Sequence, residues 1–327
     1  MRPLSVVLAT CNGERFLWEQ LQSLQPQLEW TEEIVISDDG STDSTLAVVE
    51  RFAGIVAGET KVRVLRHTST GSASENFRFA LMHTTGSWIA FCDQDDIWLP
   101  NKLPVMLSQA QRWGAAAVGC SYEVIDESGL TEGIVRWVRQ PKLVRRLQRP
   151  LLEYVLGCCQ IVSRPVVDAL LRDWPSRPNG QAEFHDFATV MVARHLGGLL
   201  LLPQPLVRYR RHGRNVSDHY ALDKGYEASM RARTGADSYR AASRLAASRA
   251  EWWRRQSTSS SLQAARDWER RSMTLMHRAK IYDTPRRARL FVLVRELLRG
   301  TYGPTSSGRL GLRSLAGDAL HWLRDRA

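Results

Sequence analysis

The stretch FCDQDDIWLP (Phe91–Pro100) ends an apolar run with three carboxylates within four positions, and these are Asp93, Asp95 and Asp96. Negative charges this close repel one another, so the cluster needs a positive partner. A hard divalent cation such as Mg²⁺ or Mn²⁺ fits, because it binds carboxylates together with the phosphates of a substrate. A solvated acidic turn is the alternative, but the apolar residues on both sides of the cluster argue against it.

Two earlier stretches show the same order of apolar and polar residues. SVVLAT (Ser5–Thr10) runs into CNG, and EIVIS (Glu33–Ser37) runs into DDGSTD. Helical periodicity follows each of them, which predicts alternating strands and helices. We therefore expect an α/β fold whose mostly parallel sheet is covered by helices on both faces. The three polar clusters should then meet on one exposed rim, at the carboxyl ends of the strands.

The pattern continues to about residue 219. Further strands are expected at 62–66, 87–92, 115–122, 157–164, 199–203 and 206–210, and helices at 17–28, 41–52, 77–81, 100–113 and 187–196. Residues 126–150 are mixed and basic, and little regular structure is expected there.

The composition suits a protein with a sizeable core. Of the 327 residues, 43% are hydrophobic and 24% charged, which argues against general disorder. The five cysteines are odd in number and lie in or beside apolar runs, which predicts reduced thiols and a cytoplasmic protein. No stretch approaches the ~18–20 apolar residues of a membrane span. The start of the chain is expected to be a buried strand rather than a signal peptide.

All the excess positive charge lies near the C-terminus. From Leu222 onward there are 22 Lys/Arg against 10 Asp/Glu, a balance of +12. Long arginine-rich helices are expected there, with breaks at Ser257–Ser261 and Thr301–Gly308. An apolar stripe beside basic positions consists of Leu290, Val294, Leu297 and Leu298, and the tryptophans expected to be exposed are Trp252, Trp253, Trp268 and Trp322.

This C-terminal pattern leaves two interpretations open. The stripe and the positive charge suit peripheral binding to an anionic membrane, here the inner face of the cell membrane. Alternatively, the stripe packs on the rest of the chain or on a second copy in a homo-oligomer. Nucleic-acid binding is not expected, because no finger, basic zipper or RNA-binding signature accompanies the arginines.

Three further positions allow both a structural and a chemical interpretation. Asp39, at a strand end, belongs either to a helix-capping turn or to a site that accepts the N–H of a base. Asp186 opens a helix, where it either complements the dipole or acts as a general base. His212, in RYRRHGRN, is either a surface residue or a contact to a metal or phosphate.

Taken together, the motifs resemble the family 2 glycosyltransferases, which are inverting enzymes with the GT-A fold. The matching motifs, spread over about Pro3–Asn215, are SVVLATCNG, EIVISDDGSTD, FCDQDDIWLPNKL, GCC, HDF and YRRHGRN. DQDDIW, with Asn76–Phe77 upstream, is most similar to the rhamnosyltransferase-like branch of bacterial surface polysaccharide synthesis. The resemblance implies a catalytic domain over residues 1–219 and leaves residues 220–327 as a separate basic, helical region.

The resemblance also implies the substrates and the roles of individual residues. The donor would be a nucleotide-diphosphate sugar of the dTDP-rhamnose or UDP-sugar class, and the acceptor a hydroxyl of a glycan or a lipid-linked glycan. Asp186 would be the catalytic base. The nucleotide side would be formed by Thr10, Asn12, Glu14, Asp39 and Asp95, and the Mg²⁺ or Mn²⁺ would be held by Asp96 and His212. Further candidates in or near the motifs are Asp93, Asn76, Lys102, Gly157 and Arg210.

The chain differs from the family pattern at two positions. GCC replaces the more usual Gly-Cys-Thr, so a thiol stands at Cys159, and His185 stands where an acidic residue often precedes the base. Two other functions share these features: a nucleotidylyltransferase, and a non-catalytic protein that binds glycans or membranes on the same scaffold. The loop ATCNGERF lacks the Gly-rich, basic character that a nucleotidylyltransferase would need.

Overall fold

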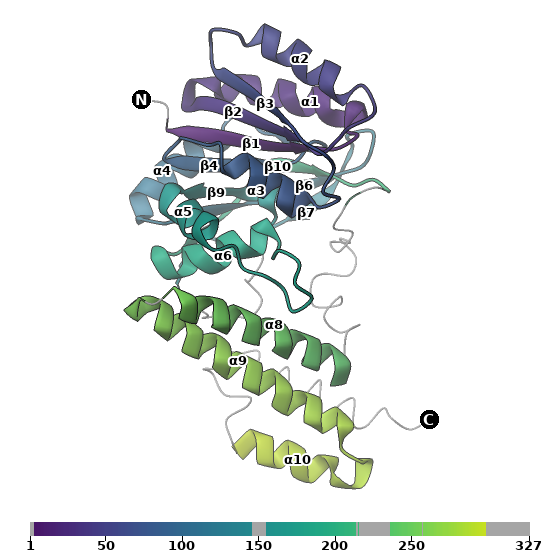
Figure 1. The fold of residues 1–327 in the computed structure, drawn as a ribbon, viewed down its shortest axis with the longest axis vertical. Coiled ribbons are helices and arrows are strands. Elements are labelled where there is room, and N and C mark those ends of the chain that lie inside the picture. The colour runs from purple at the N-terminus through teal and green to yellow at the C-terminus, as the bar shows by residue number, and fades with distance from the viewer. Residues whose placement is uncertain (1–2, 146–154, 214, 216–235, 257, 299–327) are drawn as a thin grey trace. The chain divides into compact units, whose positions relative to one another are not determined.

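A computed structural model describes residues 3–145, 155–213, 215, 236–256 and 258–298 (Figure 1). The chain divides into two compact units. The first comprises Met1–Arg145, Glu153–Trp174 and Ala182–Asp218, and the second comprises Arg146–Leu152, Pro175–Gln181 and His219–Ala327. Over the ranges described, no helix combines the length and the apolar character needed to cross a bilayer.

A ten-stranded sheet forms the core of the first unit, in the order β3-β2-β1-β4-β9-β6-β10-β5, with β7 paired to β6 and β8 to β10. The strands are β1 (Leu4–Thr10), β2 (Thr31–Asp38), β3 (Lys61–Arg66), β4 (Trp88–Cys92), β5 (Ile97–Trp98), β6 (Ala117–Ile125), β7 (Thr131–Val135), β8 (Lys142–Val144), β9 (Gln160–Ser163) and β10 (Leu199–Arg210). The first four are mutually parallel, as are β6 and β10, while β9 runs antiparallel between β4 and β6.

Helices lie on both sides of this sheet (Figure 1). They are α1 (Glu14–Leu24), α2 (Thr45–Ile55), α3 (Ala73–Leu81), α4 (Lys102–Trp113), α5 (Arg164–Arg172) and α6 (His185–Leu196), with 3₁₀ turns η1 (Gln25–Trp30) and η3 (Gly157–Cys159). Helices α1 and α2 contact each other, while α3 packs on β1 and β2 and also contacts α5 and α6. This arrangement confirms the expected α/β fold.

The sequence explains why these elements form where they do. Strand β1 is apolar and almost wholly buried, as expected for a central strand covered on both faces. The Ser72 hydroxyl caps α3 by accepting the Glu75 N–H. Helix α4 ends at Gly114, whose φ of 58° lies in the left-handed region that glycine tolerates.

Three expectations for the first unit were wrong in detail. Residues 126–150, expected to be irregular, contain β7 and β8. The two short strands expected at 199–210 are one strand, β10, whose register with β6 shifts on both sides of Pro205. Pro205 lacks an N–H, so the ladder is interrupted there without ending the strand. The expected strand at 157–164 begins as the turn η3 and continues as the shorter β9.

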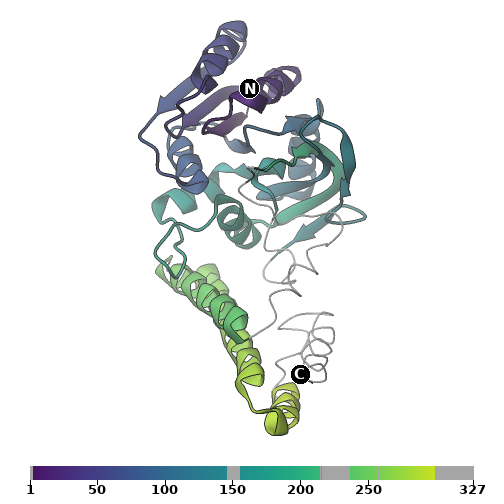
Figure 2. The same ribbon diagram turned by 90° about the vertical axis from the view of Figure 1, so that its right-hand side faces the viewer.

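The second unit contains the helices α8 (Ala236–Arg255), α9 (Ser259–Asp283) and α10 (Arg286–Leu298). Helices α8 and α9 run side by side in both views (Figures 1 and 2). Thr258 and Ser261 form a capping box at the start of α9, which explains the break expected at Ser257–Ser261. Ser243 and Ser272 bridge the two helices, with the Ser243 hydroxyl 2.8 Å from the Ser272 carbonyl oxygen.

The tryptophans of this unit correct one expectation. The side chains expected to be exposed are instead buried at Trp252, Trp253 and Trp268. Arg249 stacks its guanidinium 4.9 Å from the centroid of the Trp268 ring, so basic side chains here also cover aromatic surface. Trp322 and the predicted break at 301–308 lie outside the described residues.

Candidate active site

The polar loops at the carboxyl ends of β1, β2 and β4 bind one another. The Gln94 side chain, between the carboxylates, accepts the Cys11 N–H at 2.9 Å and donates to the Cys11 carbonyl oxygen at 3.1 Å. A Cβ atom on Gly13 would lie 2.2 Å from Gln94 Oε1, so a larger residue there would displace the Gln94 side chain from its contact with the β1 loop. The rim expected from the sequence therefore exists as one connected set of loops.

The residues predicted around the nucleotide make many of these connections. Asn12, with φ of 47°, accepts the Thr42 N–H at 2.9 Å, and Glu14 accepts the Ser44 N–H at the same distance. Thr10 donates its hydroxyl to Asp38 Oδ2 at 2.9 Å. These three side chains connect the end of β1 and the β1–α1 loop to the end of β2 and the β2–α2 loop.

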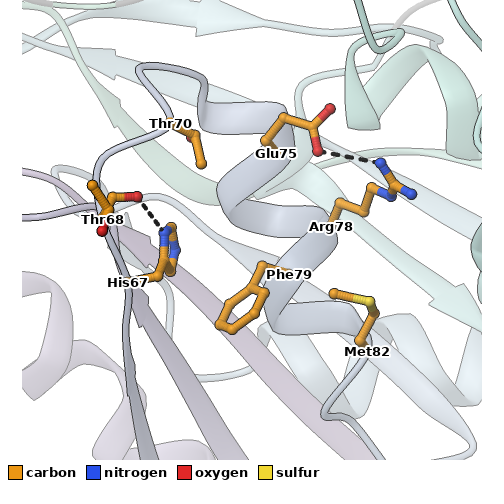
Figure 3. Close-up of a pocket in the computed structure, with 7 residues that line it drawn as sticks. All are labelled: His67, Thr68, Thr70, Glu75, Arg78, Phe79 and Met82. Carbon is orange, nitrogen blue, oxygen red and sulfur yellow. Dashed lines mark hydrogen bonds and ion pairs between the residues drawn. The ribbon is translucent and has the colours of Figure 1, made fainter.

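Asp39 holds a third loop, between β3 and α3. It is buried, and its carboxylate accepts the N–H groups of Thr70 at 2.6 Å and Gly71 at 3.1 Å. A surface pocket adjoins this loop, with walls formed by His67, Thr68, Thr70, Glu75, Arg78, Phe79 and Met82 (Figure 3). The loop that Asp39 tethers thus forms part of a hollow that the sequence analysis did not predict.

The carboxylates of the β4–β5 loop occupy different environments. Asp93, Asp96 and Cys158 place one potential ligand atom each within 4.8 Å of one another. Burial, followed by the charge of Asp95, raises the pKa of Asp93 to about 7 and that of Asp96 well above its usual range. Asp96 is fully buried, and its Oδ2 has no hydrogen-bond partner among the described residues.

These observations fit a bound divalent cation. A cation would remove the repulsion within the group and give the unpartnered Asp96 oxygen a ligand. Cys158 was not assigned a role from the sequence, although it belongs to the GCC motif. A thiolate in the ligand set favours Mn²⁺ or a softer ion over Mg²⁺.

Arg210 and His212 anchor this loop from β10. The Arg210 N–H donates to Asp96 Oδ1 at 3.0 Å, and its buried guanidinium binds the Asp95 carbonyl oxygen and the Glu19 carboxylate. His212 Nε2 lies 2.8 Å from Asp95 Oδ2, and its ring stacks on Phe16. His212, predicted as a metal ligand, therefore pairs with Asp95 rather than with the group around Asp96.

Two further candidates support neighbouring backbone. Asn76 donates its amide to the Thr10 carbonyl oxygen at 3.2 Å. Lys102 is fully buried, donates to the Cys158 carbonyl oxygen at 2.6 Å and lies over the Trp98 ring. Burial lowers the pKa of Lys102, whose ammonium is in direct contact with the turn η3.

Asp186 lies in the first turn of α6, where the helix dipole favours a negative charge. It is buried, and its Oδ1 accepts the Phe187 N–H at 2.8 Å. Gln160, which follows the turn η3, donates to the Asp186 carbonyl oxygen at 3.3 Å. A Cβ atom on Gly157 would lie 2.2 Å from Nε2 of His185, the residue before Asp186. The turn η3 is thus packed against the start of α6.

The predicted residues therefore form two sets. Asp93, Asp96 and Asp186 lie near the turn η3. The second set connects the loops at the carboxyl ends of β1, β2 and β3, and it consists of Thr10, Asn12, Glu14 and Asp39. Gln94, Cys158 and His67 also lie at these loops or in the turn η3 and were not predicted as site residues. Gln94 and Cys158 lie inside motifs that had been singled out, whereas no signal marked His67.

The sequence model of glycosyl transferase family 2 matches residues 5–171. An uncharacterized glycosyltransferase from Nostoc is 26% identical over 65% of this chain and 66% of its own length. A UDP-Glc:α-D-GlcNAc-diphosphoundecaprenol β-1,3-glucosyltransferase from Escherichia coli is 24% identical over 49% of this chain and 59% of its own. The chain thus spans under two thirds of the length of these relatives.

A solved structure has the same fold. TarS residues 1–349 from S. aureus, crystallised with UDP-GlcNAc, superimposes with a TM-score of 0.55. The two sequences are 18% identical, and the match covers 97% of this chain and 91% of TarS 1–349. This likeness concerns the arrangement of the helices and strands.

Proposed function

The chain belongs to glycosyl transferase family 2, and from this premise we propose that it is a metal-dependent, inverting glycosyltransferase. Its donor would be a nucleotide-diphosphate sugar of the dTDP-rhamnose or UDP-sugar class. Its acceptor would be a hydroxyl of a glycan or of a lipid-linked glycan in cell-surface polysaccharide synthesis. The observation that carries the proposal is the group of half-buried Asp93 with buried Asp96 and Cys158, connected through the turn η3 to Asp186.

The residues of this chain would divide the reaction between two sides of the sugar. Asp96, with Asp93 and Cys158, would hold a cation, which when bound acts as a Lewis acid for the leaving diphosphate. Asp186 would take the proton from the acceptor hydroxyl on the opposite face. A single displacement of this kind inverts the anomeric carbon. The Asp95–His212 pair would fix the loop that carries Asp96.

The relatives support the substrate classes. The name of the Escherichia coli relative gives a UDP-sugar donor and a lipid-linked acceptor. A dTDP-rhamnosyl transferase from Shigella flexneri is 37% identical over 29% of this chain and 34% of its own length. Family membership also favours sugar transfer over nucleotidyl transfer, because a transferase of this family consumes a nucleotide sugar rather than a nucleoside triphosphate.

The test is a donor screen with purified protein. UDP-glucose, UDP-N-acetylglucosamine and dTDP-rhamnose are incubated with MgCl₂, MnCl₂ or EDTA, and the release of nucleoside diphosphate is measured. We expect turnover of at least one donor, loss of turnover in EDTA, and inversion when the product anomer is determined by NMR. If no donor is bound or consumed with any cation, the chain is a non-catalytic member of the family.

Asp186→Asn identifies the base within the same assay. The amide has the same shape but cannot accept the proton, so transfer should fall at least ~10²-fold with little change in donor affinity. Asp168→Asn is the matched control, because Asp168 is an exposed carboxylate on α5 that pairs with Arg164 at 3.9 Å. Unchanged transfer in Asp186→Asn would remove Asp186 from the mechanism, and an equal loss of donor binding would place it on the nucleotide side.

A further inference from the structure

The imidazole of His185 fills the space between the turn η3 and the end of β4. Its ring centroid lies 4.1 Å from that of Phe77 and 5.2 Å from that of Phe91, both of them core residues. Gly157 closes the remaining side, where even a Cβ atom would collide with Nε2. His185 is 8% exposed, so its surroundings are those of a core aromatic residue.

The two ring nitrogens of His185 are polar atoms in an apolar environment. Neither Nδ1 nor Nε2 has a hydrogen-bond partner in the described part of the chain. Burial lowers the pKa of His185 to about 3, so at neutral pH the ring offers one N–H donor and one acceptor nitrogen. A phenylalanine would pack against Phe77 and Phe91 without leaving polar atoms unpaired. Buried polar groups without a partner are rare in native proteins, and such departures from local rules are expected at functional sites.

The position of the ring indicates what that other state is. Two residues after Phe91 comes Asp93, of the proposed cation group, and directly after His185 comes Asp186, the proposed base. If the proposed function holds, the transferred sugar must lie between the cation-bound diphosphate and the base. That sugar would therefore lie beside the turn η3 and the His185 ring.

We propose that a ring nitrogen of His185 hydrogen-bonds a hydroxyl of the transferred sugar when the donor is bound. The inference rests on the proposed function and adds a residue that recognises the sugar. Because both nitrogens are covered, the turn Gly157–Cys159 must shift to uncover Nε2, which faces Gly157. The transferred sugar would then supply the partner that the protein lacks.

Nitrogen NMR of ¹⁵N-histidine-labelled protein tests the contact directly. The His185 ring signals are assigned by their loss in His185→Phe. They are then followed with MgCl₂ plus UDP-glucose or dTDP-rhamnose, and with MgCl₂ plus UDP or dTDP alone. We expect a ring-nitrogen shift with a nucleotide sugar and none with the nucleotide alone. Equal shifts with both, or no shift with a sugar that is turned over, would overturn the inference.

Kinetics separates a hydrogen bond from packing. His185→Phe keeps an aromatic ring and should reduce donor turnover about 10-fold or more, while His185→Gln, which keeps a donor and an acceptor, should recover part of it. His195→Phe, the same change at the other end of α6, is the control and should stay within about twofold of wild type. Wild-type turnover in His185→Phe would show that the ring only packs. If His185→Phe does not fold, the loss of the ring signals in His185→Gln assigns them instead, and the kinetics of His185→Gln and the NMR comparison decide.

The two proposals fail in different ways. If the proposed function is wrong, the wild-type protein consumes no nucleotide sugar and Asp186→Asn changes nothing. If only the inference is wrong, the wild-type protein is active, Asp186→Asn is inactive and His185→Phe behaves as the wild type.

Discussion

The buried carboxylate of Asp96 lowers the stability of the folded protein. Its charge is withdrawn from water beside Asp93 and Asp95, and the Arg210 N–H satisfies Oδ1 alone. A carboxylate whose pKa is raised in the folded protein weakens folding at any pH where the unfolded chain would ionise it. Asp96 was expected on an exposed rim, and this expectation was wrong because its side chain is fully buried.

Asp96→Asn should therefore separate stability from cation binding. Without a cation, the neutral amide relieves the repulsion, and we expect the free energy of unfolding at pH 7–8 to rise by about 1–3 kcal/mol. With MnCl₂, the wild-type Tm should increase and that of Asp96→Asn should not. Thermal melts in EDTA and in MnCl₂ measure both effects. An Asp96→Asn protein that is less stable in EDTA, or equally stabilised by MnCl₂, would contradict the cation assignment.

Asp39 also stabilises the loop between β3 and α3, a structural role that was not predicted from the sequence. Because its carboxylate holds the N–H groups of Thr70 and Gly71, Asp39→Ala leaves two donors without that acceptor. We expect a loss of about 1–3 kcal/mol in the free energy of unfolding, together with a higher KM for the donor. Urea unfolding and donor kinetics check this. A variant with wild-type stability and an altered kcat alone would place Asp39 in the chemistry instead.

The sequence predicted where the site residues lie relative to the strands better than it predicted their hydrogen-bond and ion-pair partners. Asp93, Asp95 and Asp96 were all expected at a strand end, and they are there. Which of them would be buried could not be read from the sequence, because it depends on Arg210 and Cys158, which are more than 60 positions away. The same holds for the pairing of His212 with Asp95. The roles assigned to Thr10, Asn12, Glu14 and Asp39 in binding the nucleotide stay predictions.

At the scale of elements, strongly apolar strands were the easiest to predict. Strands β1, β2 and β4 are buried on both faces, so an uninterrupted apolar run marks each of them. Strand β7 is largely exposed and β8 has only three residues, so neither has such a signal. The turn η3 was also missed, because a buried run such as GCCQIV has no period that distinguishes a turn from a strand.

The start of α6 should make the protein sensitive to acid. His185 has a folded pKa of about 3, below its ordinary value of ~6.5, so the unfolded chain binds more protons between these pH values. Stability therefore falls as the pH drops through this window, and His185 alone should cost about 2 kcal/mol between pH 7 and pH 5.

His185→Phe removes this titration. Its stability relative to wild type should grow as the pH is lowered from 7 to 5, which denaturant melts at several pH values can measure. A constant difference between His185→Phe and wild type across this range would mean that the ring is not held neutral by burial.

At the scale of the whole chain, the structure weakens one argument for membrane binding and leaves another. Three of the tryptophans invoked for an interface are buried in the α8–α9 pair. The apolar stripe of α10, however, is exposed: Leu298 is 83% accessible, and Leu290, Val294 and Leu297 are also exposed. Phe291, on the same helix but outside the predicted stripe, is 71% accessible. We propose residues 220–327 as a peripheral membrane region that acts beside a catalytic domain of residues 1–219.

Flotation with liposomes tests this region. Binding should increase with the content of anionic lipid and weaken in high salt, because the basic residues act through charge. The double variant Phe291→Ser with Leu298→Ser should bind at least ~10-fold more weakly, since two inserted apolar side chains are lost. Met82→Ser, on an exposed residue of the first unit, is the control. Equal flotation of the double variant and the control would assign the stripe to protein packing or to a homo-oligomer.

The connected loops above the sheet have a consequence for how a protein with the proposed function could acquire a new donor. Hydrogen bonds join each loop to the next. They connect Gln94 to Cys11, Asn12 to Thr42 and Glu14 to Ser44. A loop transplanted alone from a relative would arrive without the residues that hold it. Donor specificity should therefore depend on the three loops together. Chimeras between family members should fold and keep their donor specificity mainly when all three loops are exchanged as a set.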